Sequence, residues 1–127
     1  MGAMETALSE HGHARYVDIF QRFWRTKDPQ PVAEVLADNA VASWSGLADV
    51  KGSDYPTLLH HTTTVLIPDM SLKTVSHAVT KDEVFIRWEA SGTINGRFRT
   101  WCGIDHIQFR GAKVVRIDAI FDTAALA

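Results

Sequence analysis

This chain of 127 residues is poor in cysteine and has no long apolar run. Its single cysteine, Cys102, cannot form a disulfide within the chain, which suits a reducing compartment, so we expect a cytoplasmic protein. The longest apolar runs fall far short of the ~18 residues that span a membrane. The first 16 residues also lack the basic and apolar segments of a secretory signal, so we expect no association with a membrane.

The chain also has no large excess of positive or negative charge, since its formal net charge is −2. The chain has no Lys/Arg cluster and no Cys/His finger spacing, so we expect no nucleic acid as a partner. No group of His, Asp and Glu residues has the spacing of metal ligands. Neither a glycine-rich phosphate loop nor a G-x-S-x-G motif occurs, and we therefore expect neither a metal nor another cofactor.

Apolar residues, in contrast, make up 46% of the chain, which is enough for a hydrophobic core. No repeat, low-complexity tract or Pro/Gly/Ser-rich linker divides the sequence. Residues 1–127 are therefore predicted to form one domain, with residues 1–8 as a loose arm. From there to about Thr26 the chain is predicted to be helical, because its apolar residues recur with helical spacing. This apolar stripe comprises Tyr16, Ile19, Phe20, Phe23 and Trp24.

Two further helices and several strands are predicted downstream. Asp28 as an N-cap and Pro29 at the first helical position predict a short helix that ends near Asp38. A third helix is predicted over residues 53–67, with Leu58, Leu59, Val65 and Leu66 on its apolar side. Strands are predicted at about 40–44, 70–79, 83–94, 97–109 and 113–121. Helices followed by an antiparallel meander predict the α+β class.

The Asn95-Gly96 pair predicts a two-residue hairpin turn, and this turn fixes how the two longest strands pair. Ile86 then lies opposite Asp105, and Trp88 lies opposite Gly103, which leaves room for the indole. The apolar face under the helices comprises Val84, Ile86, Trp88, Ala90, Trp101 and Ile107. Asp105 therefore points into the apolar side, with Arg99 nearer the hairpin tip.

The pairing of the last strand is left with two alternatives, which depend on the turn at residues 110–112. A three-residue or bulged turn directs Val115, Ile117, Ala119 and Phe121 inward. A strict two-residue turn instead directs Arg116, Asp118 and Ile120 inward. Burial of apolar side chains favours the first alternative.

Asp105 is the principal candidate for a chemical role. A buried carboxylate is costly unless it is hydrogen-bonded, paired or protonated, and desolvation raises its pKa. A carboxyl group titrating near neutrality suits general acid–base catalysis or hydrogen-bond donation to an oxyanion. The alternative is purely structural: Asp105 bonds a backbone N–H or Arg99 and does nothing else.

Histidine and tryptophan residues supply further candidates. One of His60 and His61 on the third helix can reach the helix–sheet interior as a proton shuttle, or both can be solvated. The four tryptophans either line a cavity for an apolar ring system or fill the core. They are Trp24, Trp44, Trp88 and Trp101.

Three segments carry a family resemblance: W-x-A-S-G-T-x-x-G at 88–96, G-I-D-H-I-Q-F-R-G-A-K-V from 103, and the closing A-I-F-D-T-A-A-L. They resemble the nuclear transport factor 2-like superfamily, in its SnoaL-like polyketide cyclase and ketosteroid isomerase branch. The resemblance implies a cone-shaped roll of three N-terminal helices packed on a curved antiparallel or mixed β-sheet. It covers nearly the whole chain.

The resemblance also implies site residues. Asp105 aligns with the protonated, oxyanion-binding Asp of ketosteroid isomerases, a role taken from that family. Trp44 stands where the isomerases have their proton-abstracting Asp, and Tyr16 or Phe20 lies near their helix-one Tyr. Limonene-epoxide hydrolases use an Arg and two Asp at the positions of Ile86, Trp88 and Ala119, so epoxide hydrolysis by that triad is excluded.

These observations predict an enzyme of the cyclase, isomerase or dehydratase (lyase) type that acts on a hydrophobic cyclic or polyketide-like carbonyl compound. Asp105 would be the acid or acid/base, His60 a second shuttle near a polar pocket position of the isomerases, and Arg99 a rim group that orients the substrate. The ring would be held by Tyr16, Phe20, Trp24, Trp44, Ile86, Trp88, Trp101 and Phe121.

The alternative is a non-catalytic small-molecule-binding or dimerisation module of the same fold, since a fold does not decide function. The outer face of the sheet mixes apolar and polar residues, which predicts a homodimer through that face. Its residues are Phe85, Arg87, Glu89, Cys102, Ile104 and His106.

Overall fold

The first helix carries the aromatic stripe that faces the sheet. The computed structural model describes residues 3–126, and helix α1 spans Ala3–Thr26. Tyr16, Ile19, Phe20 and Phe23 are buried, and Trp24 is half-buried against the core. Residues 3–8, predicted as a loose arm, are helical, since Ala, Met, Glu and Leu in this segment are good helix formers. Residues 1–2 lie outside the described residues.

The second helix, α2 (Gln30–Val35), is shorter than predicted, and strand β1 (Leu36–Trp44) follows it directly. The backbone N–H of Gln30 donates to Oδ1 of Asp28 at 3.0 Å, so Asp28 supports the helix start as expected. The helix ends before Asp38 because Leu36 already has extended backbone and pairs with Val114 of the last strand. Tertiary pairing thus overrides the helical pattern.

The third helical segment changes its winding along its length. A 3₁₀ turn, η1 (Gly52–Asp54), leads into α3 (Tyr55–His61) and then into a π-helical turn, η2 (Thr62–Leu66). The hydroxyl groups of three consecutive threonines donate back to backbone carbonyls, namely Thr62 to Leu58, Thr63 to Leu59 and Thr64 to His60. Such back-bonding disturbs regular α-helical winding. The predicted apolar side is therefore wrong for Val65, which is exposed, whereas Leu59 is buried and Leu66, although largely exposed, lines the cavity between the helices and the sheet.

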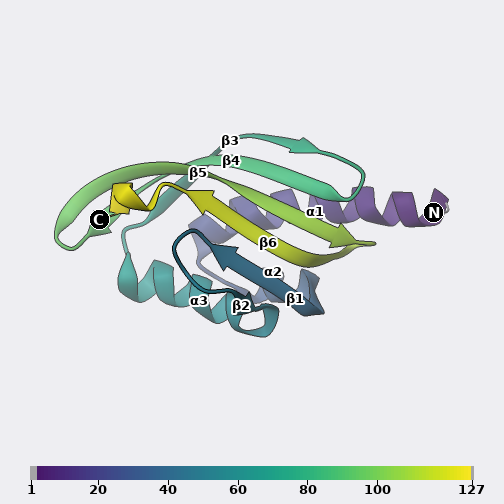
Figure 1. Cartoon of the computed structure of the whole chain (residues 1–127), viewed down its shortest axis with the longest axis horizontal. Helices are drawn as coiled ribbons and strands as arrows, with labels where there is room; N and C mark the ends of the chain where they lie inside the picture. The colour runs from purple at the N-terminus through teal and green to yellow at the C-terminus, as the bar shows by residue number, and fades with distance from the viewer. Residues whose placement is uncertain (1–2, 127) are drawn as a thin grey trace.

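Six strands form one curved mixed sheet in the order β2-β1-β6-β5-β4-β3. Besides β1 they are β2 (Val50–Lys51), β3 (Ser71–Val79), β4 (Glu83–Ile94), β5 (Arg97–Arg110) and β6 (Lys113–Phe121). Only the pairing of β1 with β6 is parallel among the described strands. Figure 1 shows the sheet arching over the helices, with the β4–β5 hairpin curling at the end where the C-terminus lies. The predicted α+β roll is confirmed.

The hairpin register follows the Asn95-Gly96 turn as predicted. Both residues have positive φ, 52° for Asn95 and 77° for Gly96, which a tight hairpin turn of this type requires. Ile94 pairs with Arg97, and the ladder continues without a shift to Ile86 opposite Asp105. Because opposed residues share a face, Asp105 lies on the inner side of the sheet, under the helices.

The last strand directs its apolar residues inward. Ile117 and Ala119 are buried, and Phe121 packs against the core. A register shift between Gln108 and Phe109 brings Val114 into the core instead of the predicted Val115. Asp118 therefore lies on the outer face, where it pairs with Arg116.

Candidate active site

A cavity of about 460 Å³ lies between the inner face of the sheet and the helices. Its walls are mainly aromatic, and they include Trp24, Trp44, Tyr55, Trp88, Trp101 and Phe121. Ser45, Thr62, Thr123 and Asp105 supply its other polar groups. Among the described residues no Lys, Arg or His lines this cavity. The volume lies in the range of small-molecule sites, and the chemistry suits an uncharged apolar ring.

Asp105 is the ionisable carboxyl group in the cavity wall. It is 4% exposed, and the indole Nε1 of Trp88 donates a hydrogen bond of 2.9 Å to its Oδ1. Burial raises the pKa of Asp105 to about 7, and the indole hydrogen bond opposes part of this increase. The carboxyl group is thus present in both protonation states near neutral pH, which suits proton transfer.

Gly103 determines where the indole of Trp88 lies. The two residues are opposite each other on β5 and β4. A Cβ atom at position 103 would lie 2.6 Å from Cζ2 of Trp88 and 2.6 Å from the backbone oxygen of Ile120. Both contacts are too close for a carbon atom, so only glycine allows the indole to lie across this strand and reach Asp105.

Tyr55 is a cavity residue that the sequence patterns did not reveal. It opens α3, is buried, and accepts a long hydrogen bond of 3.5 Å from Nε1 of Trp44. Burial, followed by the charge of Asp105, raises the pKa of Tyr55, so its phenol keeps its proton and can donate it in a hydrogen bond. Its position at the start of the third predicted helix was the available signal, because the first turn of that helix faces the core.

Five of the predicted ring-binding residues do come together in the cavity wall: Trp24, Trp44, Trp88, Trp101 and Phe121. Three others do not line it. Tyr16, Phe20 and Ile86 are buried in the hydrophobic core, where they support the wall from behind. Burial, then the charges of Tyr55 and Asp105, raises the pKa of Tyr16 well above its ordinary value.

The two predicted polar partners of Asp105 lie elsewhere. The placement expected for His60 is wrong: the side chain is exposed, and its Nδ1 lies 3.3 Å from the backbone oxygen of Lys27. Leu59 faces the core, and the next residue on a helix points about 100° away from it. Arg99 is half-buried toward the hairpin tip and is also absent from the cavity wall, contrary to the rim position expected for it.

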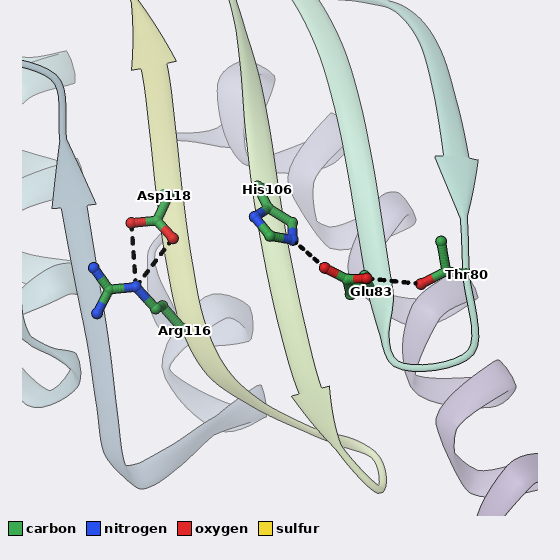
Figure 2. A network of polar contacts seen from close by, with 5 residues as sticks. All are labelled: Thr80, Glu83, His106, Arg116 and Asp118. Carbon is green, nitrogen blue, oxygen red and sulfur yellow. Dashed lines mark hydrogen bonds and ion pairs between the residues drawn. The ribbon is translucent and has the colours of Figure 1, made fainter.

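A second polar cluster lies on the opposite face of the sheet. Figure 2 shows Glu83 bonded to both His106 and Thr80, with the helices behind the strands. On β6, the next strand of the sheet, Arg116 donates to the carboxylate of Asp118 on the same face. The hydrogen bond from His106 is the main reason that the pKa of Glu83 is lowered. These groups bond one another and are separated from the cavity by the sheet.

Two features are absent from the described residues, 3–126. No group of three or more His, Cys, Asp or Glu side chains there could hold a metal ion. No helix in this range has both the length and the apolar character needed to cross a membrane.

N-terminal helices pack on a curved mixed sheet and enclose a cavity with it. This arrangement is the fold of the nuclear transport factor 2-like class of α+β proteins. Within this class, the chain belongs to the SnoaL-like polyketide cyclase family, whose model matches residues 14–127. No curated protein matches the sequence significantly.

Solved structures of low sequence identity share the fold. A hypothetical protein with a ketosteroid isomerase-like fold from Catenulispora acidiphila, in complex with trimethylamine, is 13% identical, with a TM-score of 0.76 and 87% of each chain covered. An LEH-like epoxide hydrolase from M. tuberculosis is 15% identical, with a TM-score of 0.74, covering 91% of this chain and 86% of that one. An NTF2-like protein from Anabaena variabilis is 10% identical, with a TM-score of 0.73 and coverage of 99% and 96%.

Proposed function

We propose that this protein is a cofactor-independent acid/base enzyme that acts on a hydrophobic cyclic or polyketide-like carbonyl compound. The observation that carries the proposal is the carboxyl group of Asp105, buried in the wall of an aromatic cavity with its pKa raised to about 7. Membership of the SnoaL-like polyketide cyclase family supports a reaction of the cyclase type, with isomerisation and dehydration as related reactions.

In the proposed mechanism, ionised Asp105 removes the proton on the carbon next to the substrate carbonyl, and the protonated Asp105 so formed returns it to another carbon or to a leaving oxygen of the same substrate. The phenol of Tyr55, which also lines the cavity, donates a hydrogen bond to the carbonyl oxygen and stabilises the enolate that develops there. Trp44 cannot remove a proton, and no second carboxyl group lines the cavity among the described residues. Asp105 therefore serves as acid in its protonated form and as base in its ionised form.

The cavity walls indicate the substrate class. Aromatic side chains offer flat apolar surfaces to a ring system. Because no cationic side chain of the described residues lines the cavity, a substrate with a free carboxylate or phosphate would lose its hydration without gaining a partner. An uncharged carbonyl compound of modest size is the substrate class that this lining favours.

The test compares wild type with Asp105→Asn on a panel of such carbonyl compounds. Asparagine keeps the shape of the side chain and can still accept the indole hydrogen bond, but it cannot transfer a proton. We expect turnover to fall by roughly 10²–10⁴-fold, the usual contribution of a general acid or base. Asp118→Asn, which removes a carboxylate from the outer face, is the matched control and should keep wild-type turnover. Equal rates for wild type and Asp105→Asn would exclude Asp105 from the mechanism.

A second candidate function is ligand binding without catalysis. It is favoured by Trp44, which occupies a cavity position where the isomerase resemblance implies a proton-abstracting carboxylate. In that case, members of the panel would bind wild type and Asp105→Asn in the cavity, and neither protein would convert them. Direct binding measured by calorimetry, alongside turnover, separates the two functions.

A further inference from the structure

The indole of Trp88 is the immediate hydrogen-bonding neighbour of the Asp105 carboxyl group. We infer that Trp88 is a positioning residue, which keeps the acidic proton of Asp105 on Oδ2, the oxygen that the indole does not contact, and that Gly103 holds the indole in place for this. The catalytic meaning of this arrangement rests on the proposed function, but the arrangement itself can be measured without a substrate.

The first step concerns which oxygen can carry the proton. An indole N–H is a donor only, so the oxygen that it contacts must accept. Nε1 of Trp88 lies 2.9 Å from Oδ1 of Asp105. The carbonyl oxygen of a carboxylic acid is a better acceptor than its hydroxyl oxygen, so the indole contact favours the protonated form in which Oδ1 is the carbonyl oxygen and Oδ2 carries the hydrogen. The carboxyl group forms part of the cavity wall, and a hydrogen on Oδ2 is not engaged by the indole.

The second step concerns how firmly the indole is held. Trp88 is 4% exposed, and it lies across Gly103, where a Cβ atom would come within 2.6 Å of Cζ2 and 2.9 Å of Cη2. The ring of Phe121 packs on it with centroids 6.1 Å apart. Trp88 and Asp105 are diagonal neighbours on adjacent strands, a spacing that a long aromatic side chain bridges. The sheet itself thus fixes the direction of the N–H bond.

The third step concerns the other groups around the carboxyl. Ile86 of β4 and Ala119 of β6 lie opposite Asp105 and are apolar. Tyr55 of α3 and Tyr16 of α1 are the titratable groups whose ionisation is coupled to Asp105, and burial keeps both neutral. The indole hydrogen bond is then the interaction that favours the ionised carboxylate and opposes desolvation. Removing this bond should raise the pKa of Asp105.

The test is a ¹³C NMR titration of the labelled Asp105 carboxyl group in the free protein. We expect Trp88→Phe to raise the pKa by about one unit, a tenfold change that corresponds to the loss of one hydrogen bond to a charged group. Trp101→Phe, which removes another indole from the same cavity, should leave the pKa unchanged. If Trp88→Phe folds poorly, replacement of Trp88 by 3-benzothienylalanine removes the N–H and keeps the ring shape.

A role in packing alone would lower the unfolding temperature without shifting the pKa, and an unshifted pKa in both Trp88 replacements would overturn the inference. Gly103→Ala provides an independent check, because it displaces the indole and should shift the pKa in the same direction. If a substrate is found, Trp88→Phe should lower kcat at pH values below the pKa more than it changes KM. A wild-type pKa near 7 that shifts with Trp88, but without any turnover, would leave this inference intact and refute the proposed function.

Discussion

The protein interior accommodates the carboxyl group of Asp105 because the group keeps its proton up to about pH 7 and accepts a hydrogen bond from the indole of Trp88. Its inward direction follows from sequence, since the Asn95-Gly96 turn fixes the register and hence the face on which Asp105 lies. The hydrogen-bond partner of Asp105 could not be predicted from the sequence, because the contact with Trp88 depends on the side-chain rotation that places the indole over Gly103. His60 illustrates the same limit, since its placement depends on one step of helical rotation that no pattern in the sequence specifies.

The raised pKa of Asp105 makes stability depend on pH in a defined direction. The folded state retains the proton up to about pH 7, whereas the unfolded chain loses it near its ordinary value of 3.8. The folded state therefore binds more protons in this window, and stability falls as the pH rises through it. The shift corresponds to a loss on the order of 4 kcal/mol.

Denaturant unfolding of wild type and Asp105→Asn at several pH values measures this loss. The variant lacks the titrating group, so it should gain stability relative to wild type as the pH rises from 3.5 to 8. Taking the difference between the two proteins cancels the other titrating groups. A difference that stays constant across this range would contradict the raised pKa.

At the scale of elements, the turn residues made most strand boundaries predictable. The extension of β1 by tertiary pairing and the π-helical turn formed by side-chain back-bonding could not be predicted from the sequence. Strands β3 to β6 begin and end within one residue of their predicted positions, because turns made of glycine and polar residues separate them. Strand β1 was predicted too short, because the parallel pairing with β6 that extends it joins residues far apart in sequence. The π-helical turn was missed because threonine back-bonding has no periodic signature.

The hairpin turn gives the most direct test at this scale. Gly96 has a φ of 77°, which a β-branched residue adopts only with strain, and a Cβ atom there would meet nothing within 4 Å. Gly96→Val should therefore lower the free energy of unfolding by roughly 1–2 kcal/mol through the backbone alone. Asn95→Gly is the matched control, because glycine tolerates the φ of 52° at that position, and its effect should be smaller. Equal effects in a urea titration would refute this account of the turn.

At the scale of the whole molecule, the outer face of the sheet is suited to contact a second copy. Ile104 and Ile120 lie opposite each other on this face and are 43% and 57% exposed. The polar groups nearby already bond one another, as Glu83 does with His106 and Arg116 does with Asp118. Covering this face would therefore bury apolar area without leaving these charges unpaired. We propose a homodimer through it.

Light scattering coupled to size-exclusion chromatography tests the dimer. Ile104→Glu should shift the protein toward monomer, because it places a charge at the centre of the proposed interface. Val65→Glu is the matched control, since Val65 is equally apolar and 62% exposed but lies on the π-helical turn. A wild-type monomer, or the same mass for both variants, would refute the interface.

The parallel pairing of β1 with β6 has a consequence for synthesis on the ribosome. Strand β6 separates β1 from β5 in the sheet, so β1 has only the two-residue β2 as a strand neighbour until the last strand emerges. Trp44 at the end of β1 pairs with Ala119, and Ala119 pairs with Asp105. The nascent chain therefore cannot enclose the cavity before β6 has left the exit tunnel, so the cavity forms later than the β3–β4–β5 meander.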